Sequence, residues 1–390
     1  MKKRSGILSK LFFLLLFSRT LFAWSDYDHQ AMVAPALQQI VGKTGLGEPC
    51  AIQSLAPFLK KLTPFRPGIS SPKGDSPAGF ARFIDVNTKI PIGKLSTEES
   101  IGRSIKPIDI LRLHAIDPDD GRDQRLRSHF YREQVWFGAG TGVSSQAFRH
   151  IEKPPFNPFR FDTTFGFPFW RLGQATDRVQ LYFDLALLAR SMGEEYWGWR
   201  FLAASFHYLQ DLHQPFHATQ ISPEIASRGL RLYFQWGRAE HFSPIGTIAH
   251  LMSNLHHFFE EYVGELSRKG LFNEPLKGTD TDHFVTPFQY ATVIRDRSNR
   301  LAAKTIHVTA ALARPVLFTP YKFPEEHDEA RNFLATDSVT FDKDREELMG
   351  IVRESFGNAG IAMRTLVFAY QREPKEQDSE KLLKRIERYR

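Results

Sequence analysis

The chain has 390 residues, 42% of them hydrophobic and 24% charged, which is enough to bury one large core or two modest ones. Its formal charge is +7, but five basic residues and no acidic residue lie in positions 1–23, so removing that segment leaves +2. A nearly neutral remainder argues against a protein that binds nucleic acid through its overall charge.

The first 23 residues have the pattern of a secretory signal. A basic start at residues 2–4 precedes an apolar run at residues 11–17, and the small residue Ala23 stands directly before Trp24. The alternative is an N-terminal membrane anchor, but a spanning helix needs about 20 apolar residues and this run is shorter. We therefore expect cleavage before Trp24 and export to a periplasm or out of the cell, with no transmembrane segment in the mature chain.

The only cysteine is Cys50, so an exported chain of this kind has no disulfide framework. Core packing or bound metal must then stabilise the fold. No histidine stands close to Cys50 in the sequence, and we expect a small loop residue rather than a nucleophile.

Apolar residues recur at helical spacing in six segments: 27–41, 175–192, 194–213, 247–267, 298–313 and 343–371. Between them lie loop-like segments rich in Pro, Gly, Ser, Phe or acidic residues: 64–80, 117–123, 137–146 and 153–170. No strand alternation and no internal repeat stands out. The pattern predicts one all-α domain over residues 24–372 with long loop insertions, and a charged tail at 373–390 that is a solvated helix or a frayed end.

The strongest chemical pattern is His207, Asp211 and His217. His207 and Asp211 are four residues apart, so on a helix they share a face and can coordinate one ion or bridge two. Pro215 should end the helix and let His217 turn back toward the same place. Placing a histidine and an aspartate in so apolar a helix is costly unless they are paired or bind metal.

A second pair lies in a later helix. His256 and Glu260 have the same spacing of four, although His257 and Glu261 fit that spacing equally well. The pair alone is a weak indication of a metal site.

Together, the motif H-x-x-x-D-x-H-Q-P-x-H and the later N-L-H-x-x-x-E-x-Y-V resemble the zinc-dependent phospholipase C and single-strand nuclease superfamily. That resemblance implies a helical fold with three zinc ions in a cleft. It also implies that the amine and carbonyl of the mature N-terminal Trp24 bind zinc, with His29 five residues on. Such an amine exists only after signal removal, so the two expectations support each other.

The family pattern requires one more aspartate and one more histidine before His207. The best matches are Asp117 and His129; Asp119 or Asp120 could replace the first, and His114 or His150 the second. By the same resemblance, Asp117 is also the candidate catalytic residue that orients or deprotonates the attacking water. The resemblance thus implies nine ligands: Trp24, His29, Asp117, His129, His207, Asp211, His217, His256 and Glu260.

Mixed imidazole and carboxylate ligands suit zinc better than calcium or magnesium. We therefore expect a zinc-dependent phosphodiester hydrolase. A phospholipid substrate is favoured by Glu260 and by residues 128–131, which resemble the lipase branch; the aromatic segments 154–161 and 165–170 could contact a lipid interface. The short Trp24–His29 spacing instead resembles the nuclease branch, whose substrate is single-stranded nucleic acid or a nucleotide. A metal-stabilised binding protein without turnover is a third reading.

Overall fold

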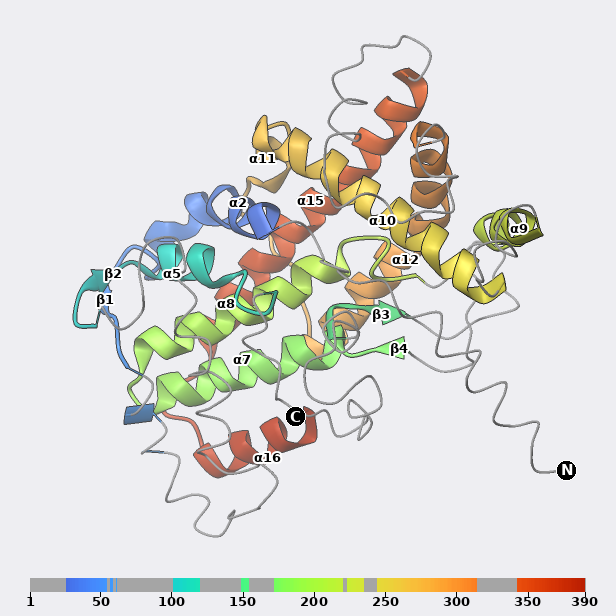
Figure 1. Ribbon diagram of the computed structural model, residues 1–390. Helices are drawn as coiled ribbons and strands as arrows, with labels where there is room; N and C mark the ends of the chain where they lie inside the picture. Colours follow the sequence, from blue (N-terminus) through green and yellow to red (C-terminus); the bar gives the residue numbers. More distant parts are fainter. Residues whose placement is uncertain are drawn as a thin grey trace, which may run out of the picture.

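The computed structural model describes residues 26–54, 57–58, 61, 101–119, 149–153, 172–219, 223–234, 244–313 and 342–389. This part of the chain is predominantly helical, as the sequence predicts (Figure 1). Its helices are α2 (Asp26–Leu37), the short 3-10 helix η2 (Gln38–Lys43), α5 (Pro107–His114), α7 (Ala175–Ser191), α8 (Glu195–Leu212), α9 (Pro223–Leu232), α10 (Pro244–Arg268), α11 (Asn273–Leu276), α12 (Pro287–Leu312), α15 (Asp342–Arg372) and α16 (Ser379–Tyr389).

The six helical segments expected from apolar periodicity are all present. The main difference is α12, which begins at Pro287 rather than near 298. Thr286 has extended backbone, and its side chain accepts a hydrogen bond from the Gln289 N–H, while Pro287 takes the first helical position. This is a regular N-terminal cap. The short helices α5, α9 and α11 were not expected, because they span too few turns for the periodicity to show.

Two small antiparallel strand pairs accompany the helices. β1 (Cys50–Ala51) pairs with β2 (Ser104–Ile105), and β3 (Glu152–Lys153) pairs with β4 (Leu172–Gly173). Gly173 has φ 116°, and a Cβ built there would lie 2.0 Å from the Ile151 carbonyl oxygen. Only glycine allows β4 to approach β3 this closely.

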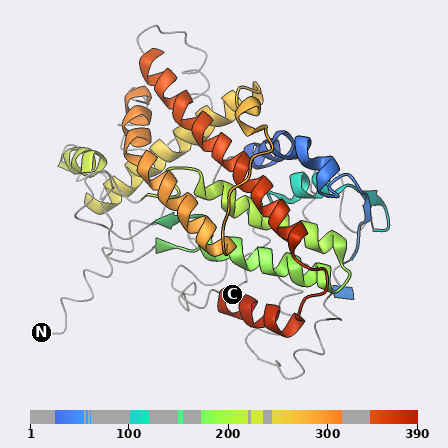
Figure 2. The ribbon, with the colours of Figure 1, turned by 180° about the vertical axis from the view of Figure 1, so that it is seen from behind.

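The core is organised around α7 and α8, which lie side by side as an antiparallel pair (Figures 1 and 2). Both are buried nearly throughout, because α5, α12, α15 and α16 pack around them. Helix α2 reaches α8 through His29. Gly198 permits close packing of α15, since a Cβ there would lie 2.4 Å from the Tyr370 hydroxyl. Residues of α8 therefore face the interior on several sides.

The charge-dense C-terminal segment was expected to be a solvated helix or a frayed end, and a helix is what the structure shows, but one that packs through one face. Over residues 379–389 it forms α16, which packs against α7. Leu382 and Ile386 are buried in the core, and Arg385 forms an ion pair with Asp184 of α7. The apolar residues recur at helical spacing among the charges, which makes the helix amphipathic and lets one side pack.

Several predictions fall on residues outside the described ranges. The signal segment, Trp24 and His129 lie there, as do most of the expected loops. Among the helices that the structure does describe, none has the combined length and apolar character needed to cross a membrane.

Candidate metal centre

The centre is built on the C-terminal half of α8. His207 and Asp211 are one turn apart and fully buried, and His207 Nε2 lies 3.4 Å from Asp211 Oδ2. His207 Nδ1 lies 2.7 Å from the Ala115 carbonyl oxygen. Because a carbonyl can only accept, Nδ1 carries the proton and Nε2 presents its lone pair toward the carboxylate.

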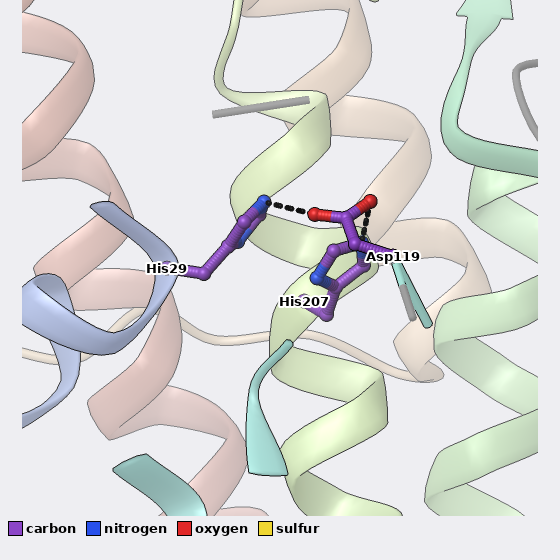
Figure 3. A group of neighbouring side chains, drawn as sticks. All are labelled: His29, Asp119 and His207. Carbon is purple, nitrogen blue, oxygen red and sulfur yellow. Dashed lines mark ion pairs between the residues drawn. The ribbon is translucent and has the colours of Figure 1, made fainter. Parts of the chain in front are cut away.

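Two distant segments bring further ligand groups to this face of α8. His29 comes from α2, and Asp119 comes from the turn that follows α5 (Figure 3). The Asp119 carboxylate lies 3.7 Å from His29 Nε2 and 3.5 Å from His207 Nε2, while His29 Nε2 lies 3.5 Å from Asp211 Oδ1. The His29 and His207 rings stack with their centroids 4.0 Å apart.

His150 completes this group from the segment before β3. Its Nδ1 lies 2.9 Å from Asp211 Oδ2, 2.9 Å from His207 Nε2 and 3.5 Å from Asp119 Oδ1. We call His29, Asp119, His150, His207 and Asp211 the five-residue cluster; it contains two overlapping groups of three that could hold a metal ion.

The three-residue cluster is His217, His256 and Glu260. The chain turns after α8, with the His217 N–H bonded to the Gln214 carbonyl, so His217 folds back as Pro215 predicts. His217 Nε2 and His256 Nε2 are 3.1 Å apart, and His256 Nε2 lies 2.8 Å from Glu260 Oε1. His217 Nδ1 donates to the His150 carbonyl at 2.7 Å, which links the two clusters.

Burial determines the protonation of these groups. Loss of solvation lowers the pKa of His29 to about 4 and holds the pKa of His150, His207 and His256 well below the usual value. The same burial raises the pKa of Glu260 well above its usual value, with Asp119 and Asp211 adding to the rise. These four imidazoles are therefore neutral at pH 7, and buried carboxylates lie beside them.

Hydrogen-bond acceptors face one another in the five-residue cluster. In the five-residue cluster, His29 Nε2 and His207 Nε2 face two carboxylates, and no described residue donates a hydrogen bond to His29 Nε2. His150 Nδ1 can place a proton between Asp211 Oδ2 and His207 Nε2, each 2.9 Å away. Buried lone pairs and carboxylates that face one another are costly unless a cation lies between them. The residues present thus fit a site that could hold metal ions.

The structure brings together six of the residues expected from the sequence: His29, His207, Asp211, His217, His256 and Glu260. The register of the α10 pair is His256 and Glu260; His257 is only half-buried, with Nδ1 3.8 Å from Glu260 Oε2. Trp24 and His129 lie outside the described residues.

Asp117 is not brought to either cluster. Its carboxylate accepts a hydrogen bond from Arg200 Nε at 2.8 Å and lies 3.2 Å from His114 Nδ1. Asp119, two residues on, occupies the cluster, while Asp120 lies outside the described residues. Likewise His150, and not His114, belongs to the five-residue cluster.

Two glutamines that sequence reasoning passed over hold the ligand groups. Gln210 Oε1 accepts a hydrogen bond from His29 Nδ1 at 2.7 Å, and Gln214 Nε2 donates to Glu260 Oε1 at 3.0 Å. Gln210 stands three residues after His207, and Gln214 stands three residues after Asp211. Helical spacing from these two cluster residues could therefore have indicated both glutamines.

Comparisons of this chain with protein-family models, with curated proteins and with solved structures give no match.

Proposed function

We propose that this protein is a zinc-dependent hydrolase of phosphoric esters, with phospholipase C-like action on a phospholipid as the first candidate activity. The observation that carries the proposal is the convergence of five imidazoles and three carboxylates on two linked buried clusters. The resemblance in the α8 and α10 motifs supports the same assignment.

The types of ligand favour zinc. Each group of three combines histidine nitrogen with a carboxylate oxygen, whereas calcium and magnesium prefer shells made of oxygen alone. Three groups of three, two of which share His207, agree with three ions per chain. In this proposal Asp119 takes the place first given to Asp117, and His150, one of the alternatives to His129, supplies a further histidine.

When bound, clustered zinc ions supply Lewis-acid polarisation of a phosphoryl oxygen and lower the pKa of a water near them. The chain's own part is to hold ligand geometry. The neutral state of His29 and His207 follows from burial, so neither needs to lose a proton at pH 7 before binding an ion. Asp119 faces both rings, and we assign it the role of orienting the attacking water or accepting its proton. No serine or cysteine nucleophile is required.

Glu260 in the last ligand position supports the phospholipase reading, because it resembles the lipase branch. The second candidate is a single-strand nuclease or 3'-nucleotidase. It is supported by the five-residue spacing from Trp24 to His29, together with the place of His29 in the five-residue cluster.

The test uses the processed protein that begins at Trp24. Metal analysis should give close to three zinc ions per chain, and a chromogenic phosphocholine ester should be hydrolysed faster than single-stranded DNA. Preference for DNA would favour the second candidate. A protein that holds zinc but turns over neither substrate would be a metal-stabilised binding protein, and one that holds no zinc would end the proposal.

Export and signal cleavage belong to the same proposal. Extra residues ahead of Trp24 remove its free amine as a ligand, so they should lower both zinc content and hydrolysis. An extended protein with unchanged zinc content and turnover would show that the terminal amine is not a ligand.

A further inference from the structure

We propose that Asp117, paired with Arg200, is a positioning residue that holds the turn at residues 115–119 against α8 and thereby presents Asp119 to the five-residue cluster. This inference rests on the proposed metal site. It gives Asp117 a different role from the ligand and catalytic role that the sequence indicates.

The ion pair is short and buried. Arg200 Nε donates to Asp117 Oδ2 at 2.8 Å, and the two residues are 5% and 7% exposed. The Arg200 guanidinium also lies over the Trp197 ring, with its carbon 4.8 Å from the ring centroid. The guanidinium is thus held by a hydrogen bond at its edge and by an aromatic ring at its face, so the Arg200 side chain has little freedom to move.

A second set of contacts holds the same aspartate. His114 Nδ1 lies 3.2 Å from both carboxylate oxygens of Asp117, and the Tyr196 hydroxyl lies 3.1 Å from His114 Nε2. Tyr196 and Arg200 are one turn apart on α8, so they reach the turn from one face of that helix.

Residues 115–119 also contact α8 at His207, which lies two helical turns after Arg200. The Ala115 carbonyl accepts the His207 Nδ1 hydrogen at 2.7 Å, and the Asp119 carboxylate lies 3.5 Å from His207 Nε2. Residues 115, 117 and 119 of the turn are thus each held on α8 or on the cluster. Because the ion pair is a direct link between Asp117 and α8, breaking it should free Asp119 while leaving the ligand itself in the chain.

A turn left free must be ordered each time an ion binds, and the lost backbone entropy weakens binding. Partners that orient a ligand without touching the metal typically account for about 10- to 100-fold in metal affinity.

The test compares Arg200→Gln with Arg385→Gln. The second variant breaks the ion pair between α16 and Asp184 of α7, which tests the effect of losing an ion pair elsewhere in the fold. Zinc affinity is measured by competition with a chromophoric chelator, the absorption spectrum of the cobalt-loaded protein reports ligand geometry, and urea unfolding reports stability. We expect Arg200→Gln to weaken zinc binding about 10- to 100-fold and alter the cobalt spectrum, whereas Arg385→Gln should change stability alone.

A double variant tests whether Arg200 acts through Asp119. In the Asp119→Asn background, Arg200→Gln should lower the affinity for the remaining zinc ions by less than about threefold. The reason is that Arg200 acts through Asp119, which this background has already removed as a ligand. Asp117→Asn keeps the shape of the side chain and should reproduce the weakening if Arg200→Gln does not fold. Zinc affinity equal to the parent in a folded Arg200→Gln or Asp117→Asn protein, or a full effect in the Asp119→Asn background, would overturn the inference. A parent protein that binds no zinc would overturn it together with the proposed function, which separates the two failures.

Discussion

The five-residue cluster and the three-residue cluster differ in how much of the fold each requires. In the described part of the chain, the residues of the three-residue cluster come from the turn after α8 and from one helix, α10. The five-residue cluster draws on α2, the turn after α5, the segment before β3 and α8. The entropy of ordering is larger when more separate segments must meet. The geometry of the larger cluster therefore depends more on distant packing, and α8 is the element that both clusters have in common.

The largest effect should come from the carboxylate at the centre of the larger cluster. Asp211→Asn removes the charge that faces His29, His150 and His207, so zinc affinity should fall by more than about 100-fold and hydrolysis should be lost. Metal analysis and turnover measure this. Asp184→Asn is the control, because it removes a buried carboxylate of α7 that belongs to neither cluster; its zinc content should not change. Intact metal and turnover in Asp211→Asn would contradict the metal centre.

A smaller and more local loss is expected at the other cluster. Glu260→Gln should remove one ion, with a decrease of about 100-fold in affinity at that position, and leave the ions of the five-residue cluster in place. Stepwise zinc titration counts the ions that remain. The neighbouring Glu261→Gln should bind zinc as the parent does. Loss of all ions in Glu260→Gln would show that the two clusters are one cooperative unit.

The two glutamines allow each cluster to be weakened separately. Gln210→Leu leaves the His29 Nδ1 hydrogen without its acceptor, and Gln214→Leu removes the donor to Glu260. Each should weaken zinc binding about 10-fold, the first at the five-residue cluster and the second at the three-residue cluster. The same titration measures both, and the two variants serve as each other's control. Equal loss at both clusters from either change would refute the separation.

The smallest effect concerns a histidine between the clusters that belongs to neither. Burial lowers the pKa of His213 to about 4, and its Nδ1 donates to the Leu209 carbonyl at 2.8 Å. Because the unfolded chain takes up a proton near pH 6.5 and the folded one does not, stability is lost as pH falls below that value. Between pH 8 and pH 6 this amounts to about 1 kcal/mol.

His213→Gln should remove that part of the pH dependence. Urea unfolding of parent and variant in the same excess of zinc, at pH 8 and pH 6, measures it, since the contributions of the clusters cancel in the difference. An identical loss of stability in both proteins would show that His213 titrates normally in the folded state.

Much of the helical core could be read from the sequence, because apolar periodicity reports burial of one helix face wherever a helix is long enough. The same reasoning predicted that His207 and Asp211 lie on one face of a helix, because residues four positions apart are one turn apart. It did not detect α5 or α9, whose few turns carry too short a pattern. It allowed a helix at α16 but missed that this helix packs on the core, because abundant charge concealed the buried Leu382 and Ile386.

The sequence by itself determined a helical protein with side chains that could bind metal on α8 and α10, because helical geometry fixes which residues three or four positions apart lie together. Only the tertiary structure decided that Asp119 and His150 reach the centre while Asp117 pairs with Arg200. In a turn, neighbouring carboxylates point in different directions, and no periodicity links that turn to a helix some ninety residues later. The packing of α5 and the following turn against α8 determines which of the two carboxylates reaches the cluster.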